Sequence, residues 1–290
     1  MQAFDYFVPD TLGQAIALLS ERKGEARPFA GGTDLLPLIK GRELRPKALI
    51  DLKKIKSLRD ITYDPRAGLK IGALATHNDI IANGDIAKNY PVLVQAAQTI
   101  GSVQVRNRAT VGGNLCHAVP SADMAPPLVV LGATAVIQGP EGVRRMPLED
   151  FFVGPKKSVL GPADILIGVE VPPPAPQSGA TFLKHGVRKA MEIAIVSVSA
   201  CVALDGNGRT CSAGRIVLGA VAPTPLRAKK AEALLPGKVL DKALADQAAQ
   251  MAAQEAQPIT DLRGSAEYRR AVVQALTARA LLQAAGSVKG

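Results

Sequence analysis

Two glycine-rich segments constrain this chain more than any other feature of its sequence. Residues 30–36 read AGGTDLL and residues 110–114 read TVGGN, and each segment follows an apolar or extended run. Glycine permits positive φ values and lets backbone N–H groups approach an anion without an intervening Cβ atom. Neighbouring N–H groups in such a turn form an anion-binding concavity. Together the two segments predict a cradle for a phosphate-bearing cofactor.

Better-known phosphate loops do not explain these segments. A glycine pair alone is weak evidence, because most such pairs are only turns. Neither pair is followed by the Gly-Lys-Ser or Gly-Lys-Thr of a P-loop, and no G-x-G-x-x-G opens a helix anywhere in the chain. These absences disfavour an ordinary nucleotidase and a Rossmann dehydrogenase.

Composition limits the kind of ligand and partner. With 290 residues and 47% hydrophobic content, the chain can bury a substantial core and has room for two domains. Tryptophan is absent and aromatic residues make up 3%, which disfavours binding of single-stranded nucleic acid by base stacking. The net charge of +10 comes from scattered lysines and arginines, which indicates a solvated surface that steers an anionic cofactor or an acidic protein partner.

From the sequence we expect neither a signal peptide nor a membrane span. Residues 1–5 lack the charged-then-apolar pattern of a leader, and the apolar stretches are interrupted well short of a bilayer's thickness. Three cysteines, at Cys116, Cys201 and Cys211, form no C-x-x-C pair and fall one short of an iron–sulfur ligand set. We therefore expect a cytoplasmic protein with no transmembrane segment, in a reducing compartment.

The first part of the chain alternates helical and extended patterns around the glycine segments. A capped helix is expected over residues 11–23, with Gly24 as its stop. Thr76 and Asp79 resemble a capping box for a further helix. Strands are expected at 27–30, 48–52 and 69–74, two more helical pieces within 80–100, and core-like apolar runs at 126–130 and 133–137.

A proline-rich run at residues 172–179 cannot form a central strand or a helix interior, so it predicts a domain boundary near residue 178. Beyond it, β-branched and small residues predict an antiparallel sheet. From residue 227 the chain has helical periodicity, divided by Pro236 and Pro258 into about three helices. The expected strands are 181–187, 193–204 and 214–221, with a turn at 205–208 between the last two.

At this point a resemblance emerges. Residues 29–36 and 100–117 resemble the corresponding segments of the FAD-binding medium subunits of molybdenum hydroxylases, a family that includes the flavoproteins of xanthine dehydrogenase and aerobic carbon monoxide dehydrogenase. The similarity continues through residues 122–123, 151–154 and 182–184 and through Arg188, so it covers nearly the whole chain. It implies an α+β fold with a two-subdomain FAD-binding domain of the PCMH type over residues 1–178. A smaller C-terminal domain, with a three-stranded antiparallel sheet and helices, is implied over residues 179–290.

The resemblance also implies the site residues. Both glycine segments would hold the FAD pyrophosphate, Asp123 would bond the ribose or adenine part, Leu166 would supply an apolar contact and Lys184 a basic one. Ile100 stands where some relatives carry an aromatic residue beside the cofactor. No catalytic residue and no metal site are assigned. The residues assigned to FAD are Phe29, Ala30, Gly31, Gly32, Thr33, Asp34, Leu35, Leu36, Ile100, Thr110, Val111, Gly112, Gly113, Asn114, Asp123, Leu166 and Lys184.

Plainer interpretations of some residues stay open on the sequence. Asp123 could cap the helix that begins near Met124, and Lys184 could be a solvated lysine at a strand edge. The three histidines, His77, His117 and His185, lack the spacing of a metal-ligand set. Each is expected to be an ordinary polar or hydrogen-bonded residue.

The function implied by the resemblance is electron transfer without substrate chemistry. Electrons would arrive from the [2Fe–2S] clusters of a small partner subunit, collect on FAD and leave to an external acceptor, while a large molybdopterin-binding subunit oxidises the substrate. Two copies of each of the three subunits would assemble. The alternatives are a self-sufficient FAD-dependent oxidoreductase of the same superfamily and an assembly subunit that has lost its cofactor. The substrate and the acceptor, whether NAD, quinone, ferredoxin or oxygen, stay open.

Overall fold

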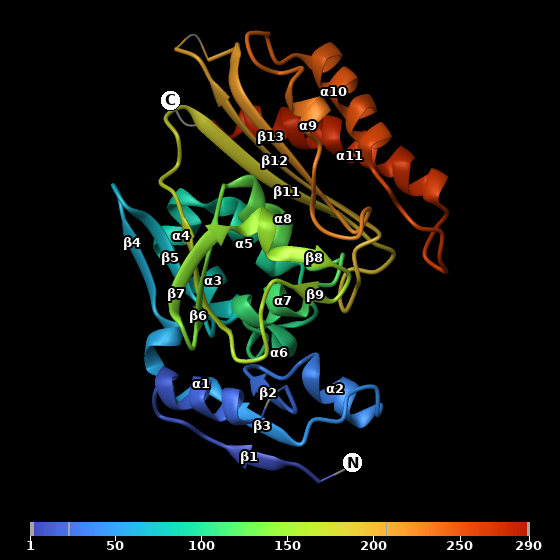
Figure 1. Ribbon diagram of the computed structural model, residues 1–290. Helices are drawn as coiled ribbons and strands as arrows, with labels where there is room; N and C mark the ends of the chain where they lie inside the picture. Colours follow the sequence, from blue (N-terminus) through green and yellow to red (C-terminus); the bar gives the residue numbers. More distant parts are fainter. Residues whose placement is uncertain (1–2, 23, 207, 289–290) are drawn as a thin grey trace.

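The computed structural model describes residues 3–22, 24–206 and 208–288. Its elements form three units stacked along the long direction of the molecule, in the order of the chain (Figure 1). Each unit has a sheet, and each contains a main cluster of buried apolar side chains. No helix among the described residues is long and apolar enough to cross a membrane.

The first unit is a three-stranded parallel sheet with short helices. Its strand order is β1-β3-β2, and all four residues of the central strand are buried, as expected for a parallel strand covered on both faces. Thr11 caps the first helix through a capping box with Gln14. The elements are β1 (Asp5–Phe7), α1 (Leu12–Glu21), β2 (Ala26–Phe29), α2 (Leu35–Lys40), β3 (Ala48–Asp51) and the 3₁₀ turns η1 (Leu52–Lys54) and η2 (Lys56–Arg59).

The second unit is a five-stranded antiparallel sheet of order β4-β5-β10-β6-β7. Six short helices lie in the chain between β5 and β6, and the buried residues of the helices and the sheet form one core. Its elements are β4 (Ile61–Asp64), β5 (Gly68–Gly72), α3 (His77–Ala82), α4 (Gly84–Asn89), α5 (Pro91–Gln98), α6 (Val103–Arg106), α7 (Val111–His117), α8 (Ala125–Val130), β6 (Thr134–Gly139), β7 (Gly142–Pro147), η3 (Leu148–Phe151), β8 (Phe152–Gly154), β9 (Lys157–Ser158) and β10 (Ile165–Val171).

The third unit is an antiparallel sheet covered on one face by two long helices, α10 and α11 (Figure 1). The other face of the sheet packs against α5 and α8 of the second unit. α11 packs directly on β11 and β12, and the alanine-rich buried side of α10 packs against α11. The elements are β11 (Ser178–His185), β12 (Val196–Leu204), β13 (Cys211–Gly219), β14 (Leu226–Arg227), α9 (Lys229–Glu232), α10 (Lys242–Glu255) and α11 (Ala266–Gly286).

The predicted α+β architecture is confirmed, with two subdomains followed by a smaller sheet-and-helix domain. The three predicted strands of the last domain correspond to β11, β12 and β13. A fourth strand, β14, extends the sheet by only two residues, because its pairing with β13 covers just Val217 and Leu218. The helical tail divides into α9, α10 and α11, as the two prolines predict.

Candidate cofactor site

The first glycine segment joins β2 to α2 and lies directly on the backbone that precedes the second segment. A Cβ atom added at Gly31 would lie 1.8 Å from the carbonyl oxygen of Arg108, so only glycine allows this approach. Gly32 has a φ of +75°, in the left-handed region that favours glycine. The fold therefore brings the two glycine segments together, although Arg108 lies 77 positions after Gly31 in the chain.

Backbone donors of the first segment are left unpaired. The N–H of Leu36 donates to the carbonyl of Gly32 at 3.0 Å. Within the described part of the chain, the N–H groups of residues 31–35 and the hydroxyl of Thr33 donate to no protein acceptor. These residues are half-buried or exposed, so the N–H groups form the open row of donors that an anion requires.

The second segment differs from this arrangement, because its backbone donors are occupied. Thr110 caps α7, and its Oγ1 accepts from the N–H of Gly113 at 3.0 Å. The N–H groups of Val111 and Gly112 donate to the carbonyls of Ala75 and Ala73, each at 2.9 Å. The expectation that both segments offer free backbone donors is therefore wrong for the second.

At Gly112, glycine is needed for close packing and not for binding an anion. A Cβ atom there would lie 2.6 Å from the Cβ of Ala73 and 2.7 Å from its carbonyl oxygen. Glycine thus lets α7 lie against the chain that leaves β5. The side chain of Asn114 bonds to the chain just after Asp123: its Oδ1 accepts from the N–H of Met124 at 3.2 Å. Its amide nitrogen has no partner in the described structure. Asn114 therefore connects this segment to the neighbourhood of Asp123.

Asp123 and Lys184 form a buried ion pair between the second and third units. The Asp123 Oδ2 lies 2.7 Å from the Lys184 Nζ, and the two side chains are 9% and 7% exposed. Lys184 also donates to the carbonyls of Thr99 at 3.1 Å and Glu192 at 2.9 Å. All three ammonium hydrogens are thus used, and the interpretation of Lys184 as a solvated edge lysine is wrong.

The other oxygen of Asp123 is unpaired. Oδ1 is buried and has no hydrogen-bond partner in the described structure. Burial raises the pKa of Asp123 to about 6, against the opposing charge and hydrogen bond of Lys184. Asp123 does not cap α8, since the residue at the cap position is Met124 and no side chain bonds there. A buried acceptor with no partner is costly, which points to a ligand donor.

The remaining assigned residues are apolar and lie in the packed interior around these groups. Ile100 and Leu166, 8% and 3% exposed, belong to the core of the second unit. Leu35 and Leu36 pack against Phe29 in a small cluster of the first unit. A Cβ atom at Gly32 would lie 2.5 Å from the Phe29 ring, so this ring supports the first segment from within.

Sequence reasoning missed the part played by His77 between the two segments. Its N–H donates to the carbonyl of Ala109 at 3.1 Å, and its side chain is fully buried. Both ring nitrogens lack a partner within the described structure, so the expected hydrogen bond of this imidazole is wrong. Burial, helped by the charge of Arg106 and opposed by that of Asp34, lowers the pKa of His77 to about 4. The only signal in the sequence was its position directly after the helix cap Thr76.

The other two histidines have partners. His117 Nδ1 lies 3.4 Å from Asp34 Oδ2 and so ties α7 to the first segment. His185 Nε2 lies 2.8 Å from the Tyr268 hydroxyl at the far end of β11. Among the described residues, no group of three His, Cys, Asp or Glu side chains could hold a metal ion.

Comparisons with known families agree with this geometry. The family described as "FAD binding domain in molybdopterin dehydrogenase" matches residues 2–174, and "CO dehydrogenase flavoprotein C-terminal domain" matches residues 181–284. The chain belongs to the FAD-binding medium subunits of molybdenum hydroxylases. As a member of this family it is an oxidoreductase subunit whose cofactor is FAD.

Individual relatives cover the medium subunit almost from end to end. The carbon monoxide dehydrogenase medium chain of Hydrogenophaga pseudoflava is 35% identical over 278 residues, 96% of each chain. The xanthine dehydrogenase FAD-binding subunit of Escherichia coli O157:H7 is 33% identical, over 97% of this chain and 95% of that one. A solved structure of the Hydrogenophaga pseudoflava carbon monoxide dehydrogenase lacking the Mo-pyranopterin moiety superposes with a TM-score of 0.95, at 34% identity over 99% of both chains.

Proposed function

We propose that this medium subunit passes electrons from the [2Fe–2S] clusters of a small partner subunit, through FAD, to an external acceptor. The observation that carries the proposal is the row of unpaired N–H groups at residues 31–35, which begins at the contact of Gly31 with Arg108, just before the second glycine segment. When bound, FAD supplies the capacity to accept and release electrons; the protein supplies binding, orientation and tuning of the redox potential.

The residues present fit FAD as a ligand. Its diphosphate needs hydrogen-bond donors, and the N–H groups of residues 31–35, the Thr33 hydroxyl and the Asn114 amide are unpaired donors in the described structure. Its ribose and adenine offer donors of their own, and Asp123 Oδ1 is an unpaired acceptor. We assign these groups to FAD, and Ile100 and Leu166 to its apolar surroundings.

The other assigned residues hold these FAD-binding groups in position. Thr110, Val111, Gly112 and Gly113 hold Asn114 and the start of α7 in place, since their backbone bonds stay within the protein. Lys184 fixes and partly neutralises Asp123 through its three hydrogen bonds. Phe29, Leu35 and Leu36 support the first segment from its own core cluster. We therefore keep all of them in the site as positioning residues.

The partners of the subunit follow from the same proposal. A relative named as a medium chain of carbon monoxide dehydrogenase supports a large molybdopterin-binding subunit and a small [2Fe–2S] subunit, which we propose assemble as a dimer of heterotrimers. Relatives of nearly equal identity are named for carbon monoxide and for xanthine, so similarity of this subunit does not single out a substrate. We propose that the large subunit binds it. The three free cysteines support a cytoplasmic location. The proposed domain division near residue 178 is supported by the start of β11 at Ser178.

The deciding experiment tests whether the flavin receives its electrons from the small subunit or directly from a substrate. The chain is purified alone, its visible spectrum recorded, and the compound released by denaturation identified by mass. We expect about one FAD per chain. The flavin should then be bleached by the chemically reduced small subunit and left oxidised by carbon monoxide or xanthine alone. Absence of flavin even after added FAD would contradict the cofactor site, and direct bleaching by a substrate would instead indicate a self-sufficient oxidoreductase.

A further inference from the structure

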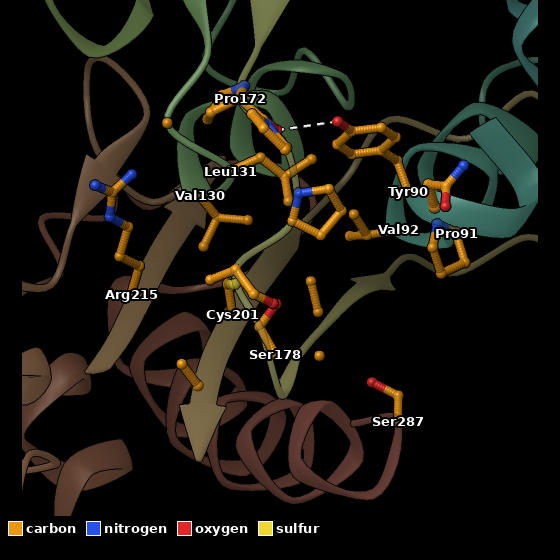
Figure 2. Close-up of a pocket in the computed structure, with 18 of the residues that line it drawn as sticks. Tyr90, Pro91, Val92, Val130, Leu131, Pro172, Ser178, Cys201, Arg215 and Ser287 are labelled. Carbon is orange, nitrogen blue, oxygen red and sulfur yellow. Dashed lines mark hydrogen bonds between the residues drawn. The ribbon is translucent and has the colours of Figure 1, made fainter. Parts of the chain in front are cut away.

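A second cavity lies between the second and third units, lined by none of the residues assigned to FAD. It is a cleft of about 500 Å³, within the size range of small-molecule sites. One wall is formed by residues 88–92, from the end of α4 to the start of α5, another by residues 130–132 at the end of α8, and a third by the prolines 172–174. Figure 2 shows Tyr90 on one side, donating to the Pro172 carbonyl at 3.0 Å, and Arg215 on the opposite side.

The floor of the cleft is one face of the third unit's sheet. Ala180 pairs with Cys201, and Cys201 pairs with Arg215, so these three side chains share a face. Further along the same face, Phe182 and Val217 are buried in the core of the second unit. The cleft opens where this packing stops, at the short side chains of Ala180 and Cys201.

Arg215 gives the cleft its chemical character. Its side chain is exposed, and it makes no hydrogen bond or ion pair within the described structure. The guanidinium lies over Gly132, where an added Cβ atom would be 2.5 Å from Nη1 and where φ is +74°. The described residues that line the cleft include Lys88 and Arg215 and no acidic side chain. The cleft therefore combines an apolar interior with a positive edge.

We propose that this cleft is a second binding site, for a small carboxylate with an apolar body. The carboxylate accepts from the planar Arg215 guanidinium, a geometry suited to two parallel hydrogen bonds. The hydrocarbon body lies between Val130, Leu131 and Cys201, which Figure 2 shows at the centre of the cleft. Of the two cations in the lining, Lys88 already has a partner within the protein, so Arg215 carries the proposed contact. One guanidinium suits this monoanion better than a phosphate, whose greater charge needs more donors. The site goes beyond the proposed electron-transfer function.

The cleft is connected to the cofactor site through shared elements of structure: α5, α8 and β11. Val130 ends α8, which begins just after Asp123, and Pro91 begins α5, which is followed by the Thr99 carbonyl bound to Lys184. β11 contributes Ala180 to the cleft and Lys184 to the ion pair. A ligand here contacts both units that the Asp123–Lys184 pair joins, so it should stabilise their contact as well as bind.

The test uses the full chain loaded with FAD and titrated with octanoate in a calorimeter. We expect saturable binding of one octanoate per chain, and binding of octan-1-ol weaker by about tenfold or more, because it lacks the charge. Arg215→Gln should weaken octanoate about tenfold or more and leave octan-1-ol unchanged. Ala203→Phe, which fills the floor, should abolish binding of both. Arg270→Gln, an exposed change on α11 outside the cleft, is the matched control and should bind as the wild type does.

The proposal is overturned by an octanoate titration without saturation, by equal affinity of Arg215→Gln and wild type, or by equal affinity for octanoate and octan-1-ol. Arg215 is exposed, so its substitution should leave the fold intact, which the thermal midpoint and the flavin content of the variant would verify. The test therefore stays decisive even where Ala203→Phe fails to fold. Loss of octanoate binding with full FAD content leaves the proposed electron-transfer function untouched.

Discussion

The two glycine segments look alike in sequence and do opposite things with their backbones. In the first, the N–H groups of residues 31–35 are unpaired and partly open to solvent. In the second, the N–H groups of residues 111–114 all donate within the protein, and Thr110 caps the helix that they begin. The first segment is therefore built to bind an anion, and the second to hold the first in place.

The glycines accordingly serve different purposes. Gly31 lets one segment lie on the carbonyl of Arg108, so it fixes the spacing between the segments. Gly112 lets α7 lie on Ala73, so it fixes the second segment to its sheet. A glycine pair in a sequence thus indicates a close approach, and only the hydrogen-bond partners of the neighbouring N–H groups tell whether a ligand or the protein makes it.

The largest effect is expected from Gly31→Ala. Its methyl group would lie 1.8 Å from a backbone oxygen that cannot rotate away, so the two segments must separate. We expect the apoprotein to lose about 3 kcal/mol of unfolding free energy or more, and the Kd for FAD to rise at least about 100-fold. Urea unfolding and flavin titration measure the two quantities. Gly13→Ala is the matched control, since nothing lies within 4 Å of its Cβ position. An active flavin site in Gly31→Ala would show that the segments do not need this contact.

His77 sharpens the comparison through pH, because it lies buried beside Ala109, the residue before the second segment. Its pKa falls from 6.5 to about 4 on folding, so the unfolded chain binds the proton first. The contribution of His77 to the free energy of unfolding is therefore fully present above pH 6.5. It decreases by about 3 kcal/mol as the pH falls to about 4. Asp123, with its raised pKa, acts in the opposite direction between pH 3.8 and about 6.

His77→Leu isolates the imidazole, since Asp123 is common to both proteins. Urea unfolding from pH 7 to pH 4 should give a stability that falls less steeply for the variant than for the wild type, by about 3 kcal/mol over the range. The difference arises because leucine has no proton to gain on unfolding. Parallel curves for the two proteins would mean that His77 is not held neutral by burial.

Much of this fold could be predicted from the sequence because its signals are local. The Thr11 and Thr76 capping boxes and the proline-rich run after β10 each act within a few residues. Strands β11 to β13 were found from their β-branched composition. The central strand β10 was not predicted, although Leu166 within it was named, because its place between β5 and β6 depends on partners far along the chain.

The candidate site was predicted as a set of residues but not as a set of contacts. Asp123 and Lys184 were each named, yet nothing in the sequence pairs two residues 61 positions apart. The second segment reads as a turn because glycine is a poor helix former, and packing of Gly112 against Ala73 makes it helical instead. Whether a backbone N–H group is free or occupied depends on such tertiary contacts, which the sequence does not show. The sequence alone therefore predicts the same behaviour for both segments.

Gly112 and Gly113 test the second segment with adjacent substitutions. A methyl group at Gly112 would meet the Cβ and the carbonyl of Ala73, whereas at Gly113 it would meet only the Thr110 hydroxyl at 2.9 Å. We expect Gly112→Ala to destabilise the apoprotein by about 1–3 kcal/mol, and Gly113→Ala to change it by less than about 1 kcal/mol. Urea unfolding without FAD measures both. Equal destabilisation would show that the packing on Ala73 does not determine the position of α7.

The smallest effects come from two threonines, and they separate the two purposes most cleanly. Thr33→Val removes a hydroxyl with no protein partner, so we expect the Kd for FAD to rise about three- to tenfold and the apoprotein to keep its stability. Thr110→Val removes the cap of α7, so the apoprotein should lose about 0.5–2 kcal/mol. Flavin titration and urea unfolding of both variants make the comparison. If Thr33→Val destabilised the apoprotein as much as Thr110→Val does, the first segment would be as structural as the second, and its open donors would need another explanation.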